Sequence, residues 1–196
     1  MGSDFLSGLR PALVMTLLFT LLLCGAYPLV VLGIGKVAFP HQAGGSLIVD
    51  NGVVTGSRLI GQSFTSDRYF NSRPSAAGKG YDGTASSGSN LGPTSKALVD
   101  RIKGDIALRR SQGLSGAIPA DLVTASASGL DPDISPAAAL FQVPRVAKAR
   151  KLPVAQVQLL VERAIDTPLL PFAGDPHVNV LLLDRQLDVL GATPAQ

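Results

Sequence analysis

A long apolar run near the N-terminus is the strongest pattern in this sequence. From Pro11 to Gly35 no residue is charged, and Arg10 and Lys36 flank the run. A helix rises about 1.5 Å per residue, so about 20 residues cross a bilayer core about 30 Å thick. The run therefore predicts a transmembrane helix over residues 11–35, preceded by a short head, residues 1–10. The rest of the chain, residues 36–196, is long enough for one compact domain.

The length of the run favours an uncleaved anchor over a cleaved leader. Cys24 to Ala26 make a poor cleavage site, and the apolar residues continue for nine positions beyond it. Small residues let helices approach closely, so Gly25 and Gly33, with Pro28 between them, fit a helix that packs on other transmembrane helices. Two alternatives stay open: Pro28 only kinks a lone helix, or the chain is a secreted binding protein whose leader is removed.

Charges beside the run are nearly balanced, since Asp4 and Arg10 precede it and Lys36 follows it. The positive-inside rule therefore does not decide the orientation. A very short head followed by the bulk of the chain is typical of a signal anchor. We expect the N-terminus to be cytoplasmic and the domain to be extracytoplasmic.

Beyond the run, strand-like and helix-like patterns follow one another, which predicts an α+β domain. Two β-branched stretches flank Asp50-Asn51-Gly52, a strong signal for a tight hairpin within residues 46–60. A buried strand is expected at Val178–Leu183, with a partner around residues 188–190. Helical spacing of apolar residues predicts the remaining elements. The expected helices begin after Thr94 or Ser95, at Pro119 (to Thr124), at Ser135-Pro136 (ended or kinked by Pro144) and at Pro153.

Two of these helices have patterns that predict which side is buried. The first has an apolar face made by Leu98, Ile102 and Ile106. Its charged residues are expected mostly on the solvated side: Asp100, Arg101, Lys103, Asp105, Arg109 and Arg110. The last is expected to bury one apolar side: Val154, Val157, Leu160, Val161, Ala164 and Ile165.

Residues 61–93 form a long stretch that is dense in Ser, Gly, Asn and Pro. Such a stretch within a compact domain is either disordered or an ordered functional loop. It contains four of the ten aromatic residues, Phe64, Tyr69, Phe70 and Tyr81. Because disordered segments are poor in aromatic residues, we expect an ordered loop that these rings pin in place.

Composition narrows the classes of function. The net charge of +3 is too small for a nucleic-acid footprint, and the chain has no Trp for base stacking. Its single cysteine excludes an intramolecular disulfide and a thiolate metal cluster. His41 and His177 are far apart in sequence and each lies beside a proline, so we interpret both as loop histidines.

Catalytic motifs are missing from the sequence. Gly78-Lys79-Gly80 lacks the upstream glycine of a phosphate-binding loop, and no GxSxG nucleophile elbow occurs. Asp131-Pro132-Asp133 is typical of turn and cap chemistry rather than of a metal site. Arg73 is expected to hold loop backbone through its guanidinium. The alternative function is a membrane-tethered extracytoplasmic hydrolase that uses Ser89 or Asp131.

Several short segments together carry a family resemblance. They occur in the order LIGQ (59–62), YFNSRPS (69–75), SNLGPT (89–94), DLVTAS (121–126), GLDP (129–132), ISP (134–136), RVA (145–147) and VNVL (178–181). Behind a single N-terminal span, this series resembles the KdpC family, the C subunit of the bacterial Kdp potassium-transporting ATPase. The resemblance runs from Arg10 to about Asp188, nearly the whole chain.

This resemblance implies a non-catalytic accessory subunit of an ATP-driven potassium import pump in the bacterial inner membrane. The family's subunit is described as an assembly factor or as a catalytic chaperone that raises the ATP affinity of the ATPase subunit. The implied partners are a channel-like potassium-binding subunit, a P-type ATPase subunit, a small single-span subunit and membrane lipid, without nucleic acid. The chain would have no cofactor of its own, because the partners handle ATP, Mg and potassium. The P-type signature DKTGT is indeed absent, and Asp82-Gly83-Thr84 does not match it.

An extracytoplasmic domain cannot touch cytoplasmic ATP, so any effect on ATP affinity would be indirect. We therefore expect the domain to cap or prop the potassium entrance. The candidate residues have two open roles, holding the loops of the domain or contacting a partner. They are Gln62, Tyr69, Phe70, Arg73, Ser75, Asn90, Leu91, Gly92, Asp131 and Pro132.

Overall fold

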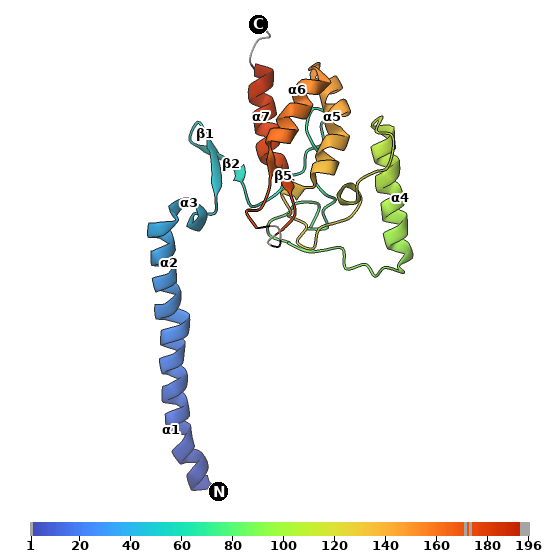
Figure 1. Cartoon of the computed structure of the whole chain (residues 1–196). Helices are drawn as coiled ribbons and strands as arrows, with labels where there is room; N and C mark the ends of the chain where they lie inside the picture. Colours follow the sequence, from blue (N-terminus) through green and yellow to red (C-terminus); the bar gives the residue numbers. More distant parts are fainter. Residues whose placement is uncertain (1, 171, 173, 193–196) are drawn as a thin grey trace. The chain divides into compact units, whose positions relative to one another are not determined.

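The computed structural model describes residues 2–170, 172 and 174–192. The chain divides into two compact units, Met1–Thr55 and Gly56–Gln196. The first consists of the N-terminal helix and most of a hairpin, and the second is a mixed α+β domain (Figure 1).

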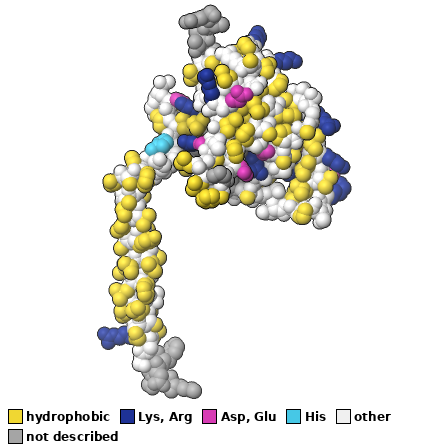
Figure 2. Space-filling view, in the orientation of Figure 1, with side chains coloured by type: hydrophobic (Ala, Val, Ile, Leu, Met, Phe, Trp, Pro, Cys, Tyr) yellow, Lys and Arg dark blue, Asp and Glu magenta, His cyan; other side chains and the backbone are white. Residues whose placement is uncertain are grey.

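The N-terminal unit is dominated by one long helical segment. It comprises α1 (Gly2–Phe19), the π-helical segment η1 (Thr20–Ala26) and α2 (Tyr27–Ala38). Residues Ser7–Ala38 are long and apolar enough to cross a membrane, which agrees with the predicted transmembrane helix. Apolar side chains cover its visible face (Figure 2). The segment extends past the predicted residues 11–35, and a long basic side chain near either end can reach the polar interface of a bilayer.

A π-helical turn lies in the middle of this segment, just before Pro28. Proline has no N–H to donate to the carbonyl four residues earlier, and its ring crowds that carbonyl. In the preceding turn the Tyr27 N–H donates to the Leu22 carbonyl, five residues back, where an α-helix would use the carbonyl four residues back. The wider turn gives the proline ring room without breaking the helix. Such turns are rare and occur often at functional sites.

A tight hairpin follows the short helix α3 (Pro40–Ala43), as predicted. Strands β1 (Leu47–Asp50) and β2 (Val53–Ser57) pair with each other. The two turn residues, Asn51 and Gly52, have φ angles of 50° and 81°. A two-residue turn with both φ angles positive matches the twist of the strands, and Asn-Gly is its preferred sequence.

The domain is built on a small antiparallel sheet in the order β3–β5–β4. The strands are β3 (Asp133–Ile134), β4 (Ile165–Asp166) and β5 (His177–Asn179), and Val178 of β5 faces both Ile134 and Ile165. Helices α5 (Pro136–Arg150), α6 (Val154–Arg163) and α7 (Val180–Ala192) stand together over it (Figure 1). Their facing sides form most of the buried core: Ala138, Ala139, Val143, Val146, Ala147, Val157, Val161, Leu183 and Leu187.

The predicted strand at Val178–Leu183 is wrong for most of its length. The strand ends at Asn179, whose side-chain oxygen accepts a hydrogen bond from the Leu182 N–H, and α7 begins at Val180. The expected partner at residues 188–190 is also part of α7. Val180, Leu183 and Leu187 are buried one helical turn apart, so the apolar run belongs to a buried helix rather than to a strand.

Other helices differ from expectation in detail. The short segment at 119–124 contains only one 3₁₀ turn, η2 (Ala120–Leu122), and α5 continues through Pro144, which is exposed. In α6 the buried side lacks Val154, which is 50% exposed. Helix α4 (Lys96–Ser111) leaves its predicted apolar face only partly buried and instead buries Arg109, 8% exposed.

The two serine N-caps give a matched test of how α5 is held. The Ser135 hydroxyl accepts a hydrogen bond from the Ala138 N–H at 3.1 Å, whereas Ser95 makes no such bond at the start of α4. We expect Ser135→Ala to lower the free energy of unfolding by about 1 kcal/mol and Ser95→Ala to change it far less. Urea unfolding of the full-length chain in mild detergent, followed by circular dichroism, measures both. Equal losses in the two variants would contradict the assigned cap.

Candidate functional site

Residues 61–93 contain no helix or strand, yet side chains from two helices hold their backbone tightly. We call four of these side chains the polar clamp: Gln142, Arg145 and Arg150 of α5, and Asp184 of α7. All of them contact the segment 67–71. This confirms that the stretch is an ordered loop.

The cationic half of the polar clamp binds carbonyl groups. Arg145 donates to the carbonyls of Asp67 and Tyr69 at 2.8 and 2.9 Å. Arg150 donates through Nε to the Arg68 carbonyl at 2.7 Å. The Arg145 side chain is 4% exposed and that of Arg150 is 3% exposed, so both charges are held by hydrogen bonds within the protein.

The other half of the polar clamp pairs with the next two residues. The Gln142 amide accepts from the Asn71 N–H at 2.8 Å and donates to the Asn71 carbonyl at 3.0 Å. Asp184 accepts from the Phe70 N–H at 2.9 Å. These contacts pair the loop backbone as a neighbouring strand would, and they seat the Phe70 ring in the core with 0% exposure.

Aromatic rings reinforce the same segment, as predicted. The Tyr69 ring lies 5.4 Å from that of Phe64, and the Arg150 guanidinium stands 4.8 Å from the Tyr69 ring centre. The Tyr69 hydroxyl donates to Asp188 at 3.2 Å, and Arg150 binds the other oxygen of the same carboxylate at 2.8 Å. Tyr69 and Phe70 therefore fasten the loop to α5 and α7.

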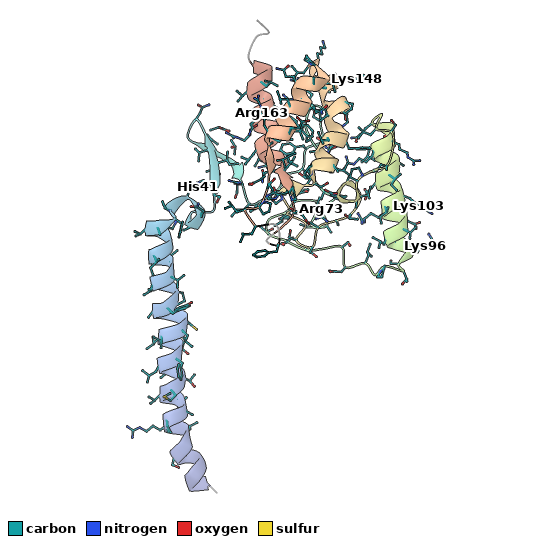
Figure 3. All side chains as sticks on the ribbon, viewed as in Figure 1. His41, Arg73, Lys96, Lys103, Lys148 and Arg163 are labelled. Atoms are coloured by element: carbon teal, nitrogen blue, oxygen red, sulfur yellow. The ribbon has the colours of Figure 1, made fainter. Side chains whose placement is uncertain are left out.

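A second polar cluster centres on Arg73, which lies among the loop segments at the base of the helices (Figure 3). Its guanidinium contacts Asp131 at 3.0 Å and the carbonyls of Thr124 and Ala125 at 3.4 Å. The predicted backbone-holding role of Arg73 is thus confirmed. The arginine links its own loop to the segment that leads to β3.

Ser75 and Tyr81 extend this cluster. The Ser75 hydroxyl donates to the Gly129 carbonyl at 2.6 Å and accepts from the Tyr81 N–H at 2.8 Å. The Tyr81 hydroxyl donates to the Arg73 carbonyl at 2.7 Å, and burial raises the pKa of this phenol. The hydroxyl groups of Ser75 and Tyr81 therefore hold the loop to the segment that contains Gly129 and to its own backbone.

Both carboxylate oxygens of Asp131 have partners within the protein. One meets Arg73, and the other accepts from the Asp133 N–H at 3.1 Å, which is the turn chemistry expected for this Asp-Pro-Asp segment. Asp133 in turn accepts from the Asn179 amide at 2.9 Å, and burial raises the pKa of Asp133. This geometry gives Asp131 a structural role and does not favour the hydrolase alternative.

The remaining candidates are Gln62, Pro132 and the three residues 90–92. Gln62 lines a cavity of about 400 Å³ between the loop and α4, where Arg109 donates to Asn71 at 2.7 Å. The Pro132 carbonyl accepts from the Val180 N–H at 3.0 Å. Near the start of α4, Asn90 is exposed with a φ angle of 52°, Leu91 is half-buried and Gly92 is exposed.

Sequence reasoning named none of the four polar-clamp residues as candidates. Asp184 follows Val180 by one helical turn and precedes Leu187, so it occupies the buried stripe of α7. A carboxylate among apolar residues at helical spacing would have indicated a buried polar contact. This spacing was not recognised, because residues 178–183 were interpreted as a strand. Among the described residues, no three His, Cys, Asp or Glu side chains gather as a metal site would require.

Comparison with known proteins shows to which family the chain belongs. Residues 9–189 match the family model described as KdpC: K+-transporting ATPase, c chain. The chain belongs to the KdpC family. The match includes nearly all of the candidate span, the loop and all four residues of the polar clamp.

Curated relatives agree over nearly their whole length. The potassium-transporting ATPase KdpC subunit of Caulobacter vibrioides (strain NA1000 / CB15N) is 58% identical over 93% of both chains. That of Caulobacter sp. (strain K31) is 55% identical over 93% of this chain and 94% of its own. That of Rhodopseudomonas palustris (strain ATCC BAA-98 / CGA009) is 51% identical over 93% and 97%. This KdpC-family chain is therefore a membrane-associated subunit of a potassium-transporting ATPase complex.

Arg145 offers the most direct test of the polar clamp. We expect Arg145→Met to lower the free energy of unfolding by about 2–3 kcal/mol, because two loop carbonyls lose a charged donor. Arg163→Met is the matched control, since Arg163 is exposed on α6, and it should change the value by less than about 0.5 kcal/mol. Urea unfolding of both full-length variants measures the difference. Similar losses in the two variants would refute the role of Arg145.

Asp184 predicts a dependence of stability on pH. Burial raises its pKa to about 8, more than the Phe70 N–H and Arg150 lower it. Below about pH 4 Asp184 is protonated in both the folded and the unfolded chain. The neutral carboxyl then makes its full contribution to the free energy of unfolding. As the pH rises toward 8, only the unfolded chain releases the proton, so stability falls.

We expect Asp184→Asn to flatten the profile of unfolding free energy between pH 4 and 8. Asp175→Asn is the control, because Asp175 is exposed and its side chain makes no described hydrogen bond. Urea midpoints of the full-length variants across this range provide the measurement. A profile for Asp184→Asn that is as steep as that of the parent chain would show that another group titrates.

Proposed function

We propose that this chain is a non-catalytic accessory subunit of an ATP-driven potassium import pump, and that its domain caps or props the extracytoplasmic potassium entrance. Family membership and the candidate span support the first part. The sequence also lacks the P-type phosphorylation signature. The observation that carries the second part is the loop 61–93, whose inner side is fixed by the polar clamp and whose outer side faces solvent.

The proposed assembly follows from the family. A channel-like subunit binds potassium, a P-type subunit hydrolyses ATP, and a small single-span subunit and lipid complete the surroundings in the bacterial inner membrane. This chain holds no cofactor, since ATP, Mg and potassium stay with its partners. Its N-terminus is cytoplasmic and its domain extracytoplasmic.

Any chaperone effect on ATP binding passes through the membrane in this proposal. The effect requires contacts that differ between two states of the pump, and the span is the part of the chain that reaches the other side. A Cβ atom added at Gly25 or Gly33 would come within 4 Å of no described atom beyond its neighbours in the same helix. These glycines, one within the π-helical segment and one beyond Pro28, therefore leave room for a neighbouring helix.

The outer surface of the loop is the part that a partner can meet. Lys79 and Ala85 are exposed, and their side chains make no described hydrogen bond or ion pair. Deleting the whole loop would be uninformative, because the deletion removes Phe70 from the core. Point substitutions on the outer surface separate partner contact from folding.

We expect the double variant Lys79→Glu, Ala85→Arg to assemble with its partners but to impair potassium uptake, since new charge and bulk disturb the proposed entrance. The control Gln156→Arg changes an exposed residue of α6 and should transport as the parent chain does. Potassium uptake by cells and yield of the purified complex are measured together. Normal uptake by the double variant would overturn the proposed role at the entrance.

A further inference from the structure

An unusual apolar surface lies on the connection between β4 and β5. Leu169 is 101% exposed, Leu170 is 52% exposed and Phe172 is 86% exposed. We call these three residues the apolar tip. Large apolar side chains that stand clear of their own domain mark an interaction site when they lie together.

We infer that the apolar tip inserts into the interfacial layer of the membrane to which the N-terminal span anchors this chain. The inference rests on the membrane association of the chain and not on its proposed role at the potassium entrance. The eight residues from Thr167 to Gly174 contain no charge, between Asp166 and Asp175. The first of these carboxylates is already paired with Arg58 at 3.2 Å.

The chemistry of the tip suits lipid better than a shaped protein pocket. Leu169 and Phe172 make little contact with their own domain, and Leu170 is about half exposed. A fluid apolar layer accepts such side chains without a matching cavity. The segment also contains Pro168 and Pro171, which have no N–H. Fewer backbone donors therefore lose their water when the segment enters an apolar layer.

The connection to the candidate span keeps the domain near the bilayer, so insertion of a few side chains is enough for contact with lipid. Seventeen residues separate the candidate span, which ends at Ala38, from the domain, which begins at Gly56. Fully extended, seventeen residues reach about 60 Å, and this connection is shorter because it contains α3 and most of the β1–β2 hairpin. A tether this short keeps the bilayer near the domain, so weak apolar contacts suffice to engage it.

A single tryptophan tests the insertion, because the natural chain has none. The full-length variant Phe172→Trp is placed in nanodiscs of phosphatidylcholine, with or without brominated acyl chains. We expect its emission to shift to shorter wavelength, to lose most of its intensity with the brominated lipid, and to resist aqueous iodide. The shift should persist at high salt, since no charge is involved.

Two further variants make the test specific. Val99→Trp, a reporter on exposed α4, should respond to iodide and not to brominated lipid. Adding Leu169→Asn and Leu170→Asn to Phe172→Trp should abolish the lipid quenching while circular dichroism stays unchanged. Quenching of Phe172→Trp by iodide as strong as that of Val99→Trp would overturn the inference. Shielding from both quenchers in the assembled complex would overturn it too, because it would place a protein partner on the tip.

Discussion

The polar clamp is the interaction on which the rest of the domain depends. Arg145 and Asp184 are buried polar groups that find partners mainly in the backbone of the loop. The loop has no strand or helix to satisfy its own N–H and carbonyl groups, so it depends equally on the helices. Buried polar groups are costly when unpaired, and this mutual need joins residues far apart in the sequence into one unit.

This constraint explains how an irregular segment can serve as a functional surface. The inner side of the loop is fixed to α5 and α7, and the Arg73 cluster binds it to the segment that leads to β3. The outer side keeps a defined shape without taking part in folding. The proposed role, in which the subunit influences the pump by contact rather than by chemistry of its own, requires such a surface.

Local signals in the sequence predicted the local structure well. Asn51-Gly52 predicted the hairpin, Ser135-Pro136 predicted the start of α5, and the uncharged run predicted the candidate membrane span. The polar clamp was beyond the same reasoning, because Phe70 and Asp184 are 114 positions apart and only the fold brings them together. The run at Val178–Leu183 was misjudged because a buried helix and a buried strand have the same composition over six residues. Partner contact by the candidate residues remains a prediction.

Purification of the tagged full-length chain in mild detergent is the most direct test of whether it works as a subunit of a potassium pump. Mass spectrometry identifies the proteins that elute with it, and ATP hydrolysis by the eluate is measured with and without potassium. We expect two larger membrane proteins in the eluate and ATP hydrolysis that potassium stimulates. A chain that elutes alone, with no potassium-stimulated hydrolysis in the eluate, would contradict it.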